Sequence, residues 1–208
     1  MRKADAGGRN RKRIEAGARA GIKNLKALLL AVLLVAVSGW PPKANADANN
    51  TSEYDVKAAF LFHLAQFVEW PAEAFLSAES PLTYCMVGQD VFRGALDESV
   101  KGKRIGNRPL RVLHLREREP INGCHVLFIG AAQRGRQAEE LASANGRPML
   151  TVGETADFAQ EGGIIGFFLE EKKVRFEINV GAAEKARLKI SAKLLALAKT
   201  VQGSAKGD

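Results

Sequence analysis

Residues 124–130 read Cys-His-Val-Leu-Phe-Ile-Gly. A short apolar run that ends at a glycine is typical of a strand buried on both faces of a sheet. Two further strands are indicated by residues 82–87 (LTYCMV), which end at Gly88, and by residues 110–115 (LRVLHL), in which apolar and polar residues alternate. The chain therefore predicts a sheet with buried central strands.

Helix signals alternate with these strands, and this order favours an α/β sheet with helices on both faces. The first expected helix runs from Ser52 to about Val68 and opens with the capping-box pattern Ser52-x-x-Asp55. It is apolar around nearly its whole circumference, so we expect it to be buried on more than one side. Further helical segments are expected at residues 90–97, 136–144, 155–160, 180–185 and 191–200, and a short strand at residues 149–152.

Residues 164–169 (IIGFFL) and 173–178 (KVRFEI) predict a β-hairpin, because apolar and polar residues alternate in the second arm. The expected fold class is α/β: a single-domain sandwich with a central mixed, mostly parallel sheet, helices on both faces and a C-terminal antiparallel hairpin. We place this domain at residues 53–201, between a flexible tail at 47–52 and a disordered tail at 202–208.

The first 46 residues have the three parts of a cleavable secretion signal. Nine basic residues precede an apolar run of 11 residues at 27–37 (ALLLAVLLVAV), and an Ala-x-Ala site follows at 44–46. The alternative is a membrane anchor, but a spanning helix needs roughly 20 apolar residues. We therefore expect cleavage after Ala46 and export to the periplasm.

The positive charge of the chain belongs to this segment. The whole chain has 31 basic and 23 acidic residues, of which the first 46 residues hold 10 basic and 2 acidic ones. The remaining domain of about 160 residues has 21 of each and no net charge. It lacks the electrostatic footprint of a nucleic-acid-binding protein, so we expect no nucleic-acid partner.

Cys85 and Cys124 are the two cysteines of the chain. Disulfides form and persist in the oxidising compartments that exported proteins reach. We interpret the two residues as one disulfide, and the alternative is a pair of buried thiols. Neither cysteine belongs to a Cys-x-x-Cys pattern, which argues against a thioredoxin-like redox enzyme.

The sequence contains none of the common catalytic patterns: no Gly-x-Ser-x-Gly, His-Glu-x-x-His, Walker A or dinucleotide-binding glycine motif. His63, His114 and His125 do not pair at metal-ligand spacing, and we interpret them as core or boundary residues. Adjacent glutamates at 139–140 and 170–171 are interpreted as solvated surface charges. We therefore expect no enzyme, no cofactor and no metal site.

Two features are candidates for partner or ligand binding. Phe62 faces away from other apolar residues of its helix and marks a contact surface, unless the helix is buried within the domain. The polar face of the second hairpin arm is the other candidate, and its alternative role is that of a solvent-facing edge strand. The candidate residues here are Arg175, Glu177, Asn179 and Lys189.

Several different short motifs lie along the chain in a fixed order. They lie at residues 56–61 (VKAAFL), 67–71 (FVEWP), 124–129 (CHVLFI), 150–153 (LTVG), 162–165 (GGII), 175–179 (RFEIN), 188–191 (LKIS) and 194–198 (LLALA). Each motif alone is weak. Their order and spacing together, over about residues 53–201, resemble the YfiR family of periplasmic proteins.

The resemblance implies a regulatory function. The best-known members repress an inner-membrane diguanylate cyclase by binding its periplasmic sensor domain, which lowers cyclic di-GMP and biofilm formation. An outer-membrane lipoprotein that sequesters the repressor is a further implied partner, and a homodimer is plausible. By position, Cys85 and Cys124 would be the family's cross-linking pair. Some members carry a second, late pair that this chain lacks, so its bridge is expected to be structural.

Other functions remain open. The alternative is a periplasmic small-ligand binding or sensor module that acts on another membrane signalling protein, with its ligand near Arg175, Glu177 and Lys189. A hydrolase with an unrecognised site is a third possibility. Repression needs no chemistry, because a repressor acts by binding the inactive state of its target more tightly than the active one.

Overall fold

The computed structural model describes residues 46–201 and, from Glu53 onward, their side chains. The expected secretion signal, apart from Ala46, and the expected tail at 202–208 lie outside the described residues. The α-helices are α2 (Ala46–Gln66), α3 (Ala95–Val100), α4 (Gln137–Ala144), α5 (Val180–Lys185) and α6 (Ala192–Leu195). Two 3-10 helices are η1 (Ala72–Ala74) and η2 (Ala131–Arg136).

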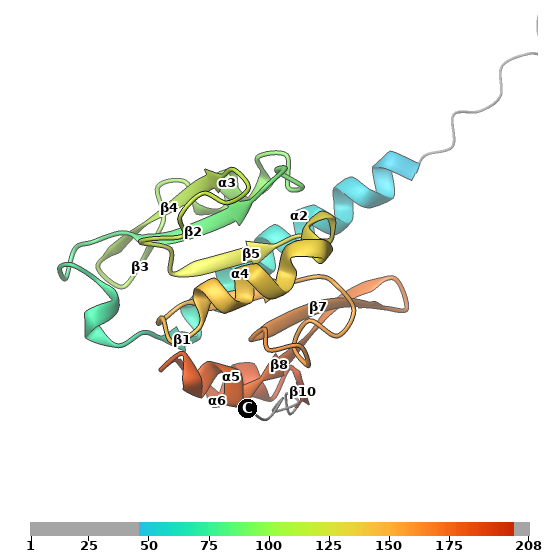
Figure 1. Ribbon diagram of the computed structural model, residues 1–208. Coiled ribbons are helices and arrows are strands. Elements are labelled where there is room, and N and C mark those ends of the chain that lie inside the picture. Colours follow the sequence, from blue (N-terminus) through green and yellow to red (C-terminus); the bar gives the residue numbers. More distant parts are fainter. Residues whose placement is uncertain (1–45, 202–208) are drawn as a thin grey trace, which may run out of the picture. The chain divides into compact units, whose positions relative to one another are not determined.

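The strands are β1 (Val68–Glu69), β2 (Leu82–Val87), β3 (Arg104–Ile105), β4 (Arg108–Leu115), β5 (Val126–Ile129), β6 (Leu150–Gly153), β7 (Ile165–Glu170), β8 (Lys173–Asn179), β9 (Lys189–Ile190) and β10 (Lys199–Val201). Within residues 46–201, eight of them form one sheet in the order β10-β8-β7-β6-β5-β2-β4-β3 (Figure 1). Its pairs are parallel except for β7–β8 and β3–β4. The predicted fold class, a mixed and mostly parallel sheet with an antiparallel hairpin, is confirmed.

The two faces of the sheet carry separate apolar cores. In β2, Tyr84 and Met86 belong to the larger core, whereas Cys85 and Val87 belong to the smaller one. Helices α2 and α3 contribute to the larger core and α4 to the smaller, and Figure 1 shows α2 and α4 on opposite sides of the sheet. Because both faces are covered, successive positions of a central strand are apolar.

The C-terminal segment differs from the prediction. Residues 191–200 were expected to form one helix, but α6 ends at Leu195 and Lys199–Val201 forms β10, which pairs in parallel with β8. The outer edge of β8 offers unpaired backbone donors and acceptors, and so short a helix has little stability of its own. Strand pairing therefore prevails, and β8 is not the edge strand that the sequence suggested.

Two helix starts also differ. Helix α2 begins at Ala46 rather than Ser52, so residues 47–52 are helical where a flexible tail was expected. No glycine or proline interrupts this segment. Helix α3 begins later than residue 90, because the Asp90 carboxylate accepts hydrogen bonds from the N–H groups of Phe92 (2.9 Å) and Gly94 (2.8 Å) and holds a turn there.

Across the described part of the chain, none of the helices combines the length and the apolar character that crossing a bilayer requires.

Candidate functional site

Cys85 and Cys124 form the predicted disulfide, with their Cα atoms 5.7 Å apart. Cys85 lies in β2, and Cys124 lies just before the neighbouring strand β5. Both are buried in the smaller core. The bridge thus joins adjacent parallel strands at a position that is shielded from solvent.

Helix α2 is buried on one side only, so the prediction that it is buried on more than one side is wrong. Ala58, Leu61 and Ala65 are almost fully buried, whereas Val56 is 42% and Phe67 is 37% exposed. The sheet and α3 cover the buried side. The rest of the helix surface remains accessible and includes apolar side chains.

One part of this accessible surface continues onto the hairpin. Phe60 packs against Phe167 and Phe176, with ring centroids 6.1 and 5.8 Å apart. Val56 lies one turn before Phe60 on α2, and Leu169 lies two residues beyond Phe167, on the same face of β7. Leu169 is 53% exposed. We call Val56, Phe60, Leu169 and its cross-strand partner Val174 the α2–hairpin surface.

Phe62, the aromatic residue that the sequence singled out, is not part of this surface. Two residues along a helix differ by about 200° in direction, so Phe62 and Phe60 face different sides. Phe62 is half-buried, and the ammonium nitrogen of Lys103 lies 4.2 Å from its ring centroid. The Phe62 ring therefore already has a cation–π partner within the domain.

The polar residues of β8 have separate roles. Arg175 is exposed and forms an ion pair with Glu170 at 3.6 Å. Glu177 is buried, so the interpretation of this strand face as solvent-facing is wrong at that residue. Asn179 is also buried: its amide nitrogen donates to the Ala159 carbonyl at 2.7 Å, and its side-chain oxygen caps α5.

Lys189 lies in a different sheet from Arg175. It is exposed in β9, which pairs antiparallel with β1, and Lys189 is opposite Glu69 in that pair. Arg175 and Lys189 are near each other in sequence, but they do not lie in the same sheet.

A groove of about 880 Å³ lies between α4 and the segment that leads from β8 into α5. Its walls include the apolar residues Leu141, Met149 and Ile164 and the polar residues Asn179 and Lys185. Of the candidate residues on β8, Asn179 borders it. A groove of this size, lined by apolar residues together with polar ones such as Thr151 and Glu161, has the character of a small-ligand site.

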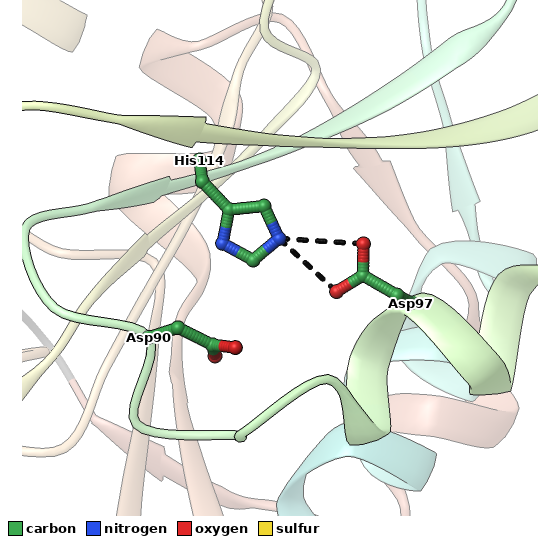
Figure 2. A group of neighbouring side chains, drawn as sticks. All are labelled: Asp90, Asp97 and His114. Atoms are coloured by element: carbon green, nitrogen blue, oxygen red, sulfur yellow. Dashed lines mark hydrogen bonds and ion pairs between the residues drawn. The ribbon is translucent and has the colours of Figure 1, made fainter.

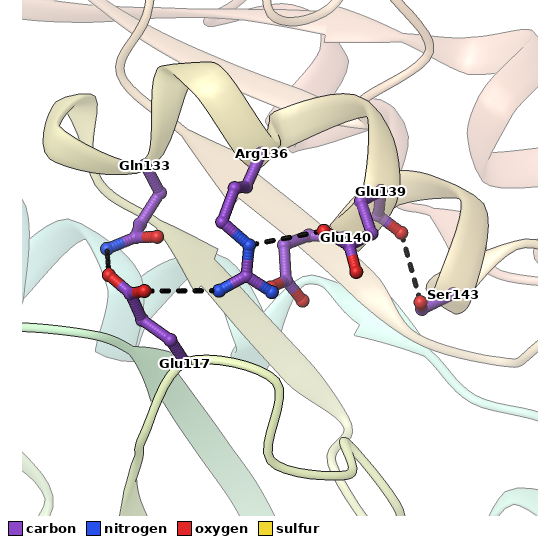
Figure 3. A network of polar contacts seen from close by, with 6 residues as sticks. All are labelled: Glu117, Gln133, Arg136, Glu139, Glu140 and Ser143. Carbon is purple, nitrogen blue, oxygen red and sulfur yellow. Dashed lines mark hydrogen bonds and ion pairs between the residues drawn. The ribbon is translucent and has the colours of Figure 1, made fainter.

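A charged network holds the start of α4 (Figure 3). The Arg136 guanidinium pairs with Glu139 and Glu140, each at 3.2 Å, and with Glu117 at 3.4 Å, while the Gln133 amide also donates to Glu117. Burial raises the pKa of Glu140, and the Arg136 charge opposes that rise. Glu140 is buried, so its interpretation as a solvated surface charge is wrong. Glu139 is exposed, which agrees with that interpretation. These side chains form ion pairs and hydrogen bonds with one another, and these contacts fix the start of α4.

A buried ion pair ties α2 to the carboxyl ends of the central strands. The ammonium of Lys57 lies 2.6 Å from Glu154, which follows β6, and both side chains are almost fully buried. The Tyr54 hydroxyl (3.1 Å) and the Ala131 N–H (2.9 Å) donate to the other carboxylate oxygen. Burial, followed by the Glu154 charge, raises the pKa of Tyr54. This cluster fixes the position of α2 and thereby of the α2–hairpin surface.

His125 is a buried histidine, as the sequence predicted. Its Nδ1 accepts a hydrogen bond from the Thr83 N–H at 3.2 Å, so Nε2 carries the proton and donates it to the Ala74 carbonyl at 3.0 Å. The ring stacks on Phe75 with a centroid distance of 4.4 Å. Burial lowers the pKa of His125, and nearby arginines lower it further.

We expect this histidine to make the protein less stable at mildly acidic pH. Because its folded pKa is below the unfolded value of about 6.5, its contribution is complete above that value and is lost as the pH falls below it. Melting temperatures measured between pH 7.5 and 5 should fall, and a His125→Gln variant should show a smaller loss over the same interval. Equal losses in both proteins would contradict the assignment.

The sequence pattern did not single out the α2–hairpin surface, although it contains a signal for it. Apolar residues continue along one face of both hairpin arms up to Leu169 and Val174. This apolar face of the hairpin is longer than the stretch that a helix can cover. Its far end is therefore expected to be exposed.

Comparisons with known proteins place the chain. The family model described as YfiR/HmsC-like matches residues 54–199. No curated protein shows significant similarity to the chain. Among solved structures, a conserved domain protein from Vibrio cholerae O1 biovar eltor is similar, with 10% sequence identity and a TM-score of 0.49. The match covers 71% of this chain and spans only 59% of the length of that protein. Since the family model covers nearly all of the described residues, this chain belongs to the YfiR/HmsC-like family.

Proposed function

We propose that this protein is a periplasmic regulator that represses an inner-membrane diguanylate cyclase by binding its periplasmic sensor domain. Repression lowers cyclic di-GMP and biofilm formation. The observation that carries the proposal is membership of the YfiR/HmsC-like family over residues 54–199, a family of regulators of diguanylate cyclase signalling. The disulfide supports an oxidising compartment such as the periplasm.

The α2–hairpin surface is our candidate for the contact with the cyclase. Its exposed apolar residues, Val56 and Leu169, are anchors that a partner can cover, whereas Arg175 lies on the opposite face of β8 and is a weaker candidate. Phe62 and Lys189 lie on other parts of the domain and serve as weaker candidates. Glu177 and Asn179 are buried, and we assign them to the fold rather than to the partner.

The first test is genetic. Deleting the gene should raise cellular cyclic di-GMP, because the cyclase loses its repressor. The full-length gene should restore the low level, and a copy lacking residues 1–46 should not, since it is not exported. An unchanged level on deletion would reject the proposed function.

A surface variant then tests the contact. Leu169→Glu places a charge in the α2–hairpin surface and should abolish complementation of the deletion without unfolding an exposed position. The matched control is Leu76→Glu, at a leucine that is fully exposed in the loop before β2. If Leu169→Glu complements as well as Leu76→Glu, the cyclase binds elsewhere.

The groove beside Asn179 favours a second function, a small-ligand binding or sensor module that acts on another membrane signalling protein. A ligand held there should raise the melting temperature in a thermal-shift screen of metabolites. The cyclic di-GMP test separates the two, because a module of this kind leaves that level unchanged. An outer-membrane lipoprotein that sequesters the protein, and a homodimer, remain proposed partners.

A further inference from the structure

Three side chains outside the surfaces described above meet at the carboxyl ends of β2 and β4 (Figure 2). Asp90 follows β2, Asp97 lies in the first turn of α3, and His114 lies near the end of β4. One ligand atom from each lies within 4.8 Å of the others. The Nε2 atom of His114 lies 3.1 and 3.3 Å from the two oxygens of Asp97, and Figure 2 shows Asp90 directed toward the same space.

The backbone holds this arrangement in place. The N–H groups of Phe92 and Gly94 donate to the two oxygens of Asp90 and fix its orientation, while each oxygen keeps a further lone pair. Because Asp97 and His114 come from a helix and a strand, their positions are set by packing rather than by a loop. Sites supported in this way lose little side-chain entropy on binding a ligand.

The surroundings are acidic. A cavity of about 650 Å³ is lined by both Asp90 and Asp97. Among the residues that the structure describes, its lining also contains Asp55 and Glu98, against a single basic residue, Arg93. Two carboxylates held this close repel each other, and a divalent cation between them removes that repulsion. The cavity has room for the water molecules that complete a coordination shell.

From this geometry we propose that Asp90, Asp97 and His114 bind a zinc ion. One imidazole nitrogen and two carboxylate oxygens are a ligand set that suits zinc, whereas magnesium and calcium prefer oxygen ligands alone. Small side-chain rotations bring the three atoms to the roughly 2.0–2.2 Å that zinc requires. Water from the cavity takes the fourth position. None of the three residues belongs to the α2–hairpin surface, so the zinc site is tested independently of the proposed repression.

The test is isothermal titration of zinc chloride into the untagged protein, purified from cells that express the full-length gene and freed of metal with a chelator. We expect saturable binding of one ion per chain, and a melting temperature that rises by roughly 5 °C at a hundredfold excess over the dissociation constant. Magnesium chloride should give neither effect.

Two histidine variants provide the comparison. His114→Asn should weaken zinc binding roughly tenfold or more while leaving the melting temperature of the metal-free protein unchanged, since the residue is exposed. His63→Asn removes an exposed histidine of α2 and should bind zinc like the wild type. The proposal is overturned if zinc does not saturate, if magnesium binds equally well, or if the two variants behave alike.

Discussion

Replacing both cysteines by serine (Cys85→Ser with Cys124→Ser) should lower the free energy of unfolding by about 4 kcal/mol. The bridge joins residues 39 apart in sequence, and closing a loop of this length removes much of the conformational freedom of the unfolded chain. The two sulfur atoms also lie in the smaller core, where serine hydroxyls would be buried among apolar side chains.

Urea unfolding followed by tryptophan fluorescence measures this effect. The oxidised wild type should unfold at a much higher urea concentration than the double variant, and adding a thiol reductant should bring the wild type close to the variant. The reductant should leave the variant unchanged, which serves as the control. A double variant that unfolds together with the oxidised wild type would show that the bridge contributes no stability.

Phe158→Ala should cost about 3–5 kcal/mol of stability. Phe158 is completely buried in the smaller core. A Cβ atom on Gly153 or on Gly163 would overlap its ring, so the backbone approaches both sides of the aromatic group. Removing the ring leaves a cavity that neither glycine can fill, because neither has a side chain to move into it.

Urea unfolding of four variants, Phe158→Ala among them, tests this packing. Phe67→Ala is the matched control, because Phe67 is 37% exposed and its loss should have a much smaller effect. Gly163→Ala alone should destabilise by about 1–3 kcal/mol through overlap with the ring. Combined with Phe158→Ala, the same change should become nearly neutral. If the effects of Gly163→Ala and Phe158→Ala simply add, the ring and the glycine are not in contact.

The central strands could be predicted because their pattern is local. Residues 82–87 and 124–129 are apolar at consecutive positions, and such runs fit a strand covered on both faces. The hairpin was predictable for the same reason, since its second arm alternates between apolar and polar residues. The pairing of Cys85 with Cys124 followed from there being two cysteines in a chain whose first 46 residues predict export.

The segments that differ from the prediction are those whose structure depends on a distant part of the chain. Residues 191–200 have a helical composition, yet Lys199–Val201 pairs with β8 because that strand has a free edge. Glu177 is on a polar strand face by sequence, but it is buried because the segment with Ala159 and Gln160 covers that face, and the Gln160 amide donates to its carboxylate at 3.4 Å. Neither outcome follows from the local sequence of the segment, because the neighbour that decides it is distant along the chain.

The sequence by itself determined the fold class, the family and the disulfide, because each follows from composition, from periodicity along one segment or from the order of short motifs; the export signal stays a prediction. Only the tertiary structure decided which side chains meet. Phe60 meets Phe167 and Phe176 through the packing of α2 on the hairpin, and Asp90, Asp97 and His114 converge from a loop, a helix and a strand. Such sites leave no regular spacing in the chain, because the distances between their residues are set by packing across the sheet rather than along the backbone.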